Sequence, residues 1–164
     1  MRPSLTLSAQ LVLVLLLLAP PAFADTFPKN FPTRFTTIAY REDPEIDLFI
    51  WRISGSKMPV SQNPEWARGK VDGIVEKVEA VLDLYPEKLH VDIYLKTFAE
   101  AGRTAFYSHE DRRITVAMDR VTDGVLAHEM AHAVVCAYYP VALPDKVQEI
   151  LAQYVDENLW SDGI

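Results

Sequence analysis

The chain has 164 residues with a single cysteine, and its 16 basic and 23 acidic side chains give it a net charge of −7. This length suits one domain with one core, and a single cysteine excludes both an intrachain disulfide framework and a cysteine-rich zinc module. An acidic chain without a basic cluster in its sequence repels phosphate backbones, so we expect no nucleic acid as a partner.

The first 24 residues have the pattern of a secretory signal peptide. Arg2 precedes the apolar run "LVLVLLLLA", and the small-x-small pattern "AFA" then ends at Ala24. This run is short against the roughly 20 residues that a membrane span needs. The sequence therefore predicts cleavage after Ala24, a secreted or periplasmic location, no stable membrane anchor, and a single mature domain over 25–164.

The first part of the mature domain is predicted to contain a hairpin and one helix. Residues 34–40 and 46–53 are rich in β-branched and aromatic residues and flank the turn-like "REDPE", which predicts two paired strands. Residues 25–33 are expected to form an extended lead-in. Asn63 at the cap and Pro64 at the first helical position predict a helix with one apolar face, ending near Leu84.

The second part is predicted to contain strands followed by two helices. Residues 89–95 alternate apolar and polar positions, and "TAFY" and "ITVAM" flank a polar turn, which predicts a second hairpin. Thr122 or Asp123 is expected to cap a helix over about 124–139, which Pro140 ends. A last helix starts at Pro144 and has helical apolar spacing at Val147, Ile150, Leu151, Tyr154, Val155 and Leu159. This order of elements predicts an α+β fold.

The motif "HEMAH" on the first of these two helices predicts a metal site. Four residues turn about 400°, so His128 and His132 lie within roughly 40° of each other and one turn apart. Both neutral imidazoles can bind one zinc ion. Glu129 lies about 100° around the helix, where it can reach a zinc-bound water and remove its proton.

Catalytic zinc usually has three protein ligands, so a third must come from outside the motif. The metzincin arrangement is excluded because Val135 and Tyr138 stand where it requires glycine and histidine. Four acidic residues remain on or near the last helix: Asp145, Glu149, Asp156 and Glu157. We choose Glu149, because a carboxylate at the edge of an apolar face is costly to bury unless it is paired or metal-bound. The predicted cofactor is one Zn²⁺ per chain.

"HEMAHAVV" followed by "EILAQY" resembles the gluzincin metallopeptidases, particularly their small single-domain members. Glu149, Ala152 and Tyr154 match the continuation typical of that family, and the likeness covers about 112–159. The resemblance implies a zincin-like domain with an N-terminal mixed sheet and one packed helix, then an active-site helix and a Glu-bearing helix. It also implies hydrolysis of a peptide or protein substrate, with the strand 114–118 as the substrate-binding sheet edge.

The chain departs from this family in three places. Ile150 stands where a glycine is frequent, and Gln153 stands where larger relatives have an aspartate that holds a zinc-binding histidine. Those relatives also have an oxyanion-stabilising group in a C-terminal subdomain, and we expect this group to be missing or supplied differently here. Four side chains are candidates for that role: Tyr138, Tyr139, Tyr154 and His109.

Other functions stay open at this point. A non-catalytic zinc-binding or protein-interaction module could share the fold, and a metalloenzyme acting on a non-peptide amide would use the same water chemistry. A protein partner could complete the substrate cleft. Cys136, one turn after His132, could be a fourth ligand or a redox group, but a small buried hydrophobe is favoured for a lone cysteine on an apolar helix.

Overall fold

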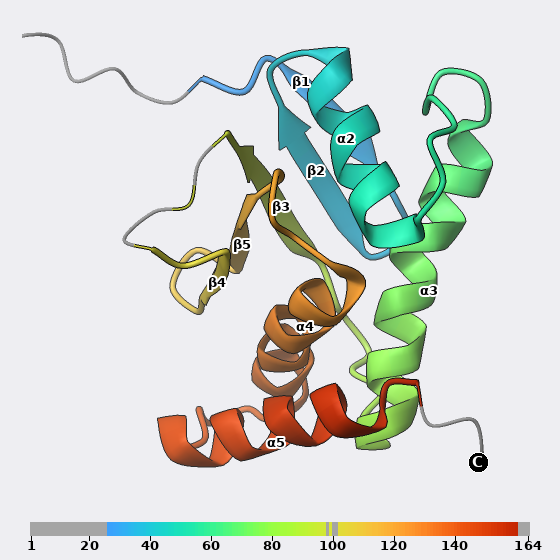
Figure 1. Ribbon diagram of the computed structural model, residues 1–164. Helices are drawn as coiled ribbons and strands as arrows, with labels where there is room; N and C mark the ends of the chain where they lie inside the picture. The colour runs from blue at the N-terminus through green and yellow to red at the C-terminus, as the bar shows by residue number, and fades with distance from the viewer. Residues whose placement is uncertain (1–25, 98, 100–101, 161–164) are drawn as a thin grey trace, which may run out of the picture.

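The computed structural model describes residues 26–97, 99 and 102–160 (Figure 1). The predicted signal peptide, residues 1–24, lies outside the described residues. Within the described part of the chain, no helix is both long enough and apolar enough to cross a membrane.

Five strands form one mixed sheet in the order β1-β2-β3-β5-β4. Their bounds are β1 (Lys29–Pro32), β2 (Thr36–Tyr40), β3 (Val91–Lys96), β4 (Ala105–Ser108) and β5 (Arg113–Ala117). The outer pairs β1–β2 and β4–β5 are antiparallel, whereas β2–β3 and β3–β5 are parallel. A mixed sheet combined with four helices confirms the predicted α+β class.

The predicted second hairpin is confirmed as β4 and β5. Ser108 pairs with Arg113 at the turn, and Arg112 adopts a left-handed backbone conformation (φ 50°) there. The central strand β3 is also confirmed. Its residues Val91, Ile93 and Leu95 are buried and alternate with half-exposed positions, as the sequence pattern predicts.

The predicted first hairpin is wrong, because residues Asp43–Ser54 form helix α2. Pro44 lies at the start of this helix, and Gly55 ends it in a left-handed conformation. Ile46, Phe49, Ile50 and Ile53 recur at spacings of three, one and three, and all four are buried. This helical period decides the structure despite the β-branched and aromatic composition. The antiparallel partner of β2 is instead β1, which lies within the expected lead-in.

Helix α3 (Pro64–Leu82) is confirmed, with the Asn63 side chain accepting a hydrogen bond from the Trp66 amide at 3.0 Å. Because α2 is also helical, two helices rather than the one predicted precede helix α4 (Asp123–Tyr138). Helices α2 and α3 contact each other, and both contact α4. They supply a large part of the hydrophobic core against which α4 is positioned.

Helix α4 (Asp123–Tyr138) carries the "HEMAH" motif. Thr122 caps it by accepting a hydrogen bond from the Val125 amide at 3.2 Å, as predicted. Leu126, Met130 and Val134 are buried in the core on one side of this helix. The side chains of His128, Glu129 and His132 are half-buried on another side, where α4 contacts β4 and helix α5 (Asp145–Asn158). Because the apolar side of α4 is buried in the core, the two histidines and Glu129 are directed toward β4 and α5.

Helix α5 (Asp145–Asn158) lies across α4 at one end of the molecule (Figure 1). Its predicted apolar face is only partly buried. Val155 and Leu159 are buried, whereas Val147, Ile150 and Tyr154 are 41–56 % exposed. The helix packs against α4 and α3 through a single narrow stripe, so the remaining apolar side chains face away from the core.

The predicted substrate-binding edge, residues 114–118, is wrong in its position. This stretch largely corresponds to β5, which pairs with β3 on one side and β4 on the other, so its backbone groups are engaged. The first strand of the hairpin, β4, forms the sheet edge instead. Because β5 takes the parallel position beside β3, β4 is left on the outside, next to α4.

Candidate metal centre

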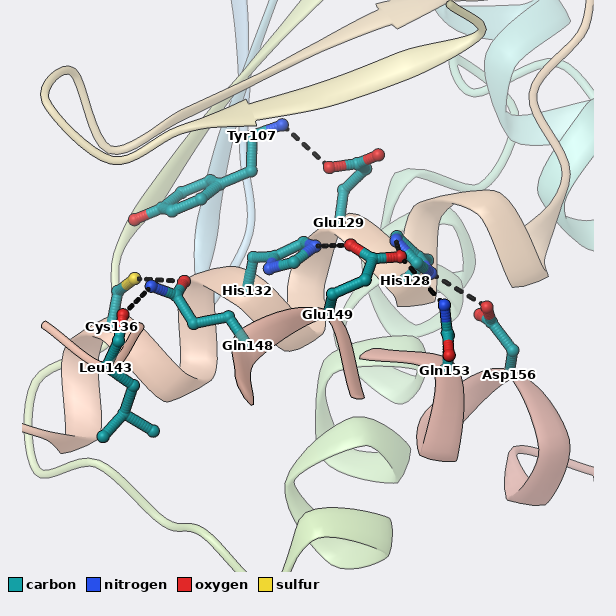
Figure 2. A network of polar contacts seen from close by, with 10 residues as sticks. All are labelled: Tyr107, His128, Glu129, His132, Cys136, Leu143, Gln148, Glu149, Gln153 and Asp156. Carbon is teal, nitrogen blue, oxygen red and sulfur yellow. Dashed lines mark hydrogen bonds and ion pairs between the residues drawn. The ribbon is translucent and has the colours of Figure 1, made fainter. Parts of the chain in front are cut away.

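Helices α4 and α5 bring the three predicted ligands together. His128 and His132 lie one turn apart on α4, with ring centroids 5.2 Å from each other. Glu149 reaches both from α5: its Oε1 lies 3.7 Å from His128 Nε2, and its Oε2 lies 3.6 Å from His132 Nε2. One ligand atom from each residue lies within 4.8 Å of the other two. Figure 2 shows Glu149 between the two imidazoles.

These separations suit a small cation. Ligand atoms at zinc bond lengths of about 2.0–2.2 Å in a tetrahedron lie about 3.4 Å apart. The two distances between Glu149 and the imidazoles are close to that value. Two imidazole nitrogens and one carboxylate oxygen are also a donor set that zinc accepts, with a fourth position left for another ligand. The group therefore has the residue types and the approximate spacing of a metal site.

Asp156 orients His128. The Nδ1–H of His128 donates a hydrogen bond to Asp156 Oδ2 at 2.8 Å, which leaves Nε2 directed at Glu149. A carboxylate behind a metal-binding imidazole fixes its tautomer and strengthens it as a ligand. Gln153, at the position where larger relatives have this aspartate, contacts another ligand instead: its Nε2 donates to Glu149 Oε1 at 3.3 Å. Residues 153 and 156 share one face of α5, and the crossing of the helices decides which of them meets His128.

Replacing Asp156 by Asn is expected to weaken zinc binding about 10–100-fold, the usual cost of losing such a partner. Asn keeps an oxygen acceptor but not the negative charge that polarises the imidazole. Competition with a chromophoric chelator measures the dissociation constant. Glu157→Gln, the same loss of charge at the neighbouring exposed position, is the matched control. An Asp156→Asn protein that binds zinc as tightly as this control would contradict the role of Asp156.

Glu129 lies outside the ligand group and is held by the sheet edge. Its Oε2 accepts a hydrogen bond from the Tyr107 backbone N–H, on β4, at 2.8 Å. Burial raises the pKa of Glu129, while His128 and the Tyr107 amide act in the opposite direction. A carboxyl group whose pKa moves toward neutrality is a stronger proton acceptor than an ordinary carboxylate. The predicted base is therefore a fixed carboxylate next to the ligands.

The electrostatics of His132 favour metal binding. Burial lowers its pKa, and the nearby His128 adds to this effect, while Glu149 and Gln148 oppose it. A lowered pKa keeps the imidazole neutral at neutral pH, and the neutral form is the one that binds a metal.

Two cavities meet at the candidate centre. The larger, with a volume of about 530 Å³, lies beside the N-terminal half of α4, and Val125, Leu159 and Trp160 form part of its apolar lining. The smaller, about 350 Å³, surrounds His132 and Glu149. Both are lined by His128 and Glu129 and by residues of the β4 edge. A volume of several hundred Å³ with a few polar groups is typical of a ligand site.

Of the four side chains predicted as candidates to stabilise the oxyanion, only one lines a cavity at the metal centre. His109 lines the cavity around His132 and Glu149, whereas Tyr138 and Tyr154 are 46 % and 48 % exposed and line neither cavity. Tyr139 lines a different cavity. Sequence reasoning missed Arg103, whose exposed side chain lines both cavities at the centre. It follows Gly102 in a predicted turn, and nothing in that stretch indicated a position beside the motif.

Cys136 is not part of the ligand group found among the described residues. Its sulfur donates to Gln148 Oε1 at 3.4 Å, and burial raises the pKa of the thiol. The side chain is half-buried rather than buried as favoured from the sequence. A protonated thiol facing an amide does not have the character of a reactive thiolate.

Comparison of the chain with protein-family models, with curated proteins and with solved structures gave no match. The functional conclusion therefore depends on the geometry of this centre. That geometry is a His128, His132 and Glu149 group at metal-binding distance, in a small α+β domain.

Proposed function

We propose that the protein is a secreted or periplasmic, zinc-dependent metallopeptidase of the gluzincin type. The observation that carries the proposal is the position of Glu129 beside the His128, His132 and Glu149 group. Three ligands leave an open position for water or substrate, and a carboxylate outside the ligand set is free to move protons.

His128, His132 and Glu149 would hold the metal, with Asp156 and Gln153 fixing two of these ligands. When bound, zinc supplies a Lewis acid that polarises a carbonyl and makes water acidic enough to attack at neutral pH. Glu129 would take the proton of the attacking water and pass it to the leaving amine. The Tyr107 amide holds the Glu129 carboxylate in place for both transfers. Arg103 and His109 line the cavity and are candidates to stabilise the oxyanion.

An extended peptide fits the β4 edge. The Tyr107 N–H points outward, toward Glu129, rather than into the β5 ladder. Backbone direction alternates along an antiparallel strand, so Ala105 presents its own N–H and C=O to the same outer side. A substrate that adds a strand there would pass directly over the ligand group. The 530 Å³ apolar cavity would then take a side chain next to the bond that is cleaved.

The test is hydrolysis of a diverse peptide mixture by the purified zinc-loaded protein, followed by mass spectrometry. Cleavage is expected to disappear after chelation and to return when zinc is added. Intact peptides in the presence of bound zinc would favour a non-catalytic zinc-binding module instead.

Replacing Gly124 by Leu is expected to change side-chain preference. A Cβ at Gly124 meets only Thr122 Oγ1, at 3.9 Å, so a larger residue fits on the backbone and projects toward the 530 Å³ cavity that Gly124 lines. Cleavage beside a large apolar residue should fall by about tenfold or more, while cleavage beside alanine persists. The ratio of kcat/KM for matched Phe and Ala peptides measures this. Gly69→Leu, a helical glycine with open space on α3, is the control.

A further inference from the structure

A third cavity, of about 460 Å³, lies beside the C-terminal half of α4 and has a basic lining. Lys88 and Arg112 supply two cationic side chains, and His90 and His109 supply two imidazoles. No carboxylate lines this cavity among the described residues. The local charge of this lining is therefore positive, whereas the net charge of the whole chain is −7.

The basic pocket is adjacent to the metal centre. It shares Tyr107 and His109 with the cavity around His132 and Glu149. Its α4 lining includes Ala133 and Cys136, the positions that follow His132 within about one turn. Figure 2 shows the Tyr107 ring extending from the Glu129 side of the centre toward Cys136. A ligand lying along β4 past Glu129 would therefore reach this pocket.

The cationic groups of the pocket are available to a ligand. The side chains of Lys88 and Arg112 make no hydrogen bond or ion pair with the described residues, whereas the adjacent Arg113 pairs with Asp111 at 2.6 Å. His90 is already engaged, because its Nε2 lies 3.1 Å from Thr37 Oγ1 and 3.7 Å from Asp92 Oδ1, so the two cations are the groups open to a ligand. The C-terminal end of α4 contributes at most about half a negative charge. Two full positive charges outweigh that contribution, so the pocket attracts anions.

Tyr107 adds a hydrogen-bond donor to this pocket. Burial raises the pKa of its hydroxyl to about 12, with Cys136 contributing and Arg112 opposing. The phenol therefore keeps its proton at neutral pH and can donate to a bound oxygen. The pocket combines two cations, two imidazoles and a hydroxyl, which together are suited to a carboxylate.

We propose that the basic pocket binds a carboxylate of the peptide substrate, either an acidic side chain or the chain terminus. This inference rests on the proposed function and adds a substrate class to it. The apolar cavity and the basic pocket lie toward opposite ends of α4, with the ligand group between them. The protein selects peptides with an apolar residue on one side of the cleaved bond and a carboxylate on the other.

Matched peptides test this selectivity through both cleavage and binding. One series carries Glu or Gln at successive positions around a fixed cleavage site, and a second series has a free or an amidated C-terminus. We expect one position, or the free terminus, to raise kcat/KM by about tenfold, the usual effect of a charge-assisted contact. Arg112→Gln and Lys88→Gln should each remove most of that gain. Lys57→Gln, the same change on the loop after α2, should keep it.

A binding measurement separates this inference from the proposed function. Fluorescence anisotropy measures how tightly each labelled peptide binds to the Glu129→Gln protein, which is not expected to cleave it. Tighter binding of the Glu or free-terminus peptide, lost in the Lys88→Gln/Arg112→Gln double variant, supports the pocket even if nothing is cleaved. Cleavage of the Glu and Gln peptides at equal rates, with equal binding of both series, overturns the pocket and leaves the peptidase proposal standing. A preference that survives in the double variant also overturns it.

Discussion

Replacing Glu129 by Gln is expected to leave zinc bound while peptide hydrolysis falls by about a thousandfold or more. The amide keeps the size of the side chain, and its oxygen can still accept the hydrogen bond from the Tyr107 amide. It cannot take a proton from water, and general acid–base catalysis contributes about 10²–10⁴-fold. Neither His128 nor Glu149 depends on Glu129 for its position, so the metal site should persist.

Zinc content and kcat/KM should be measured on the same preparation of this variant. Glu157→Gln, on the exposed side of α5, removes an equal charge without touching the centre and should behave as the unchanged protein. Normal turnover by the Glu129→Gln protein would contradict the assignment of the base. Loss of zinc together with activity would show that Glu129 contributes to metal binding instead.

Replacing His132 by Ala is expected to weaken zinc binding by more than about a hundredfold. Loss of an orienting partner alone costs about 10–100-fold, and a ligand contributes more than its partner. His132 is suited to this role because burial lowers its pKa and keeps it neutral. Its loss leaves His128 and Glu149 as the only ligands in the group, too few for a stable zinc site.

Chelator competition at fixed pH measures this effect. His90→Ala is the matched control. It removes an exposed imidazole just before β3 and should bind zinc normally. Circular dichroism should show that both variants keep their helices. An unchanged zinc affinity in the His132→Ala protein would place the metal elsewhere and contradict the proposed centre.

The sequence predicted the parts of the centre that depend on local helical geometry. The spacing within "HEMAH", the Thr122 cap and the stop near Pro140 are properties of one helix, and the structure confirms them. Glu149 could be chosen because only a few acidic residues follow the motif and one of them stands at an apolar edge. The structure confirms that the three side chains gather at metal-binding distance.

The parts that sequence reasoning missed depend on how elements meet in space. The composition of helix α2 predicts a strand because Ile and Phe favour sheets, but the period of these residues is helical and decides the structure. Which strand of the second hairpin forms the edge depends on the parallel pairing of β5 with β3. Asp156 rather than Gln153 meets His128 because of the crossing of α4 and α5.

The basic pocket illustrates the same limit for charge. Lys88 and His90 precede β3, whereas His109 and Arg112 belong to the β4–β5 turn, so no basic run appears in the sequence. The fold brings these two segments to the end of α4. A net negative charge of the whole chain therefore does not exclude a local site for anions.

The most direct test of the proposed metal centre is the zinc content of the purified protein, measured beside a Glu149→Ala variant and a Glu157→Ala control. We expect one zinc per chain in the unchanged protein and in the control, with zinc lost or much weakened in Glu149→Ala. No zinc in the unchanged protein, even after incubation with the metal, would contradict the proposed centre and leave "HEMAH" as an ordinary stretch of helix.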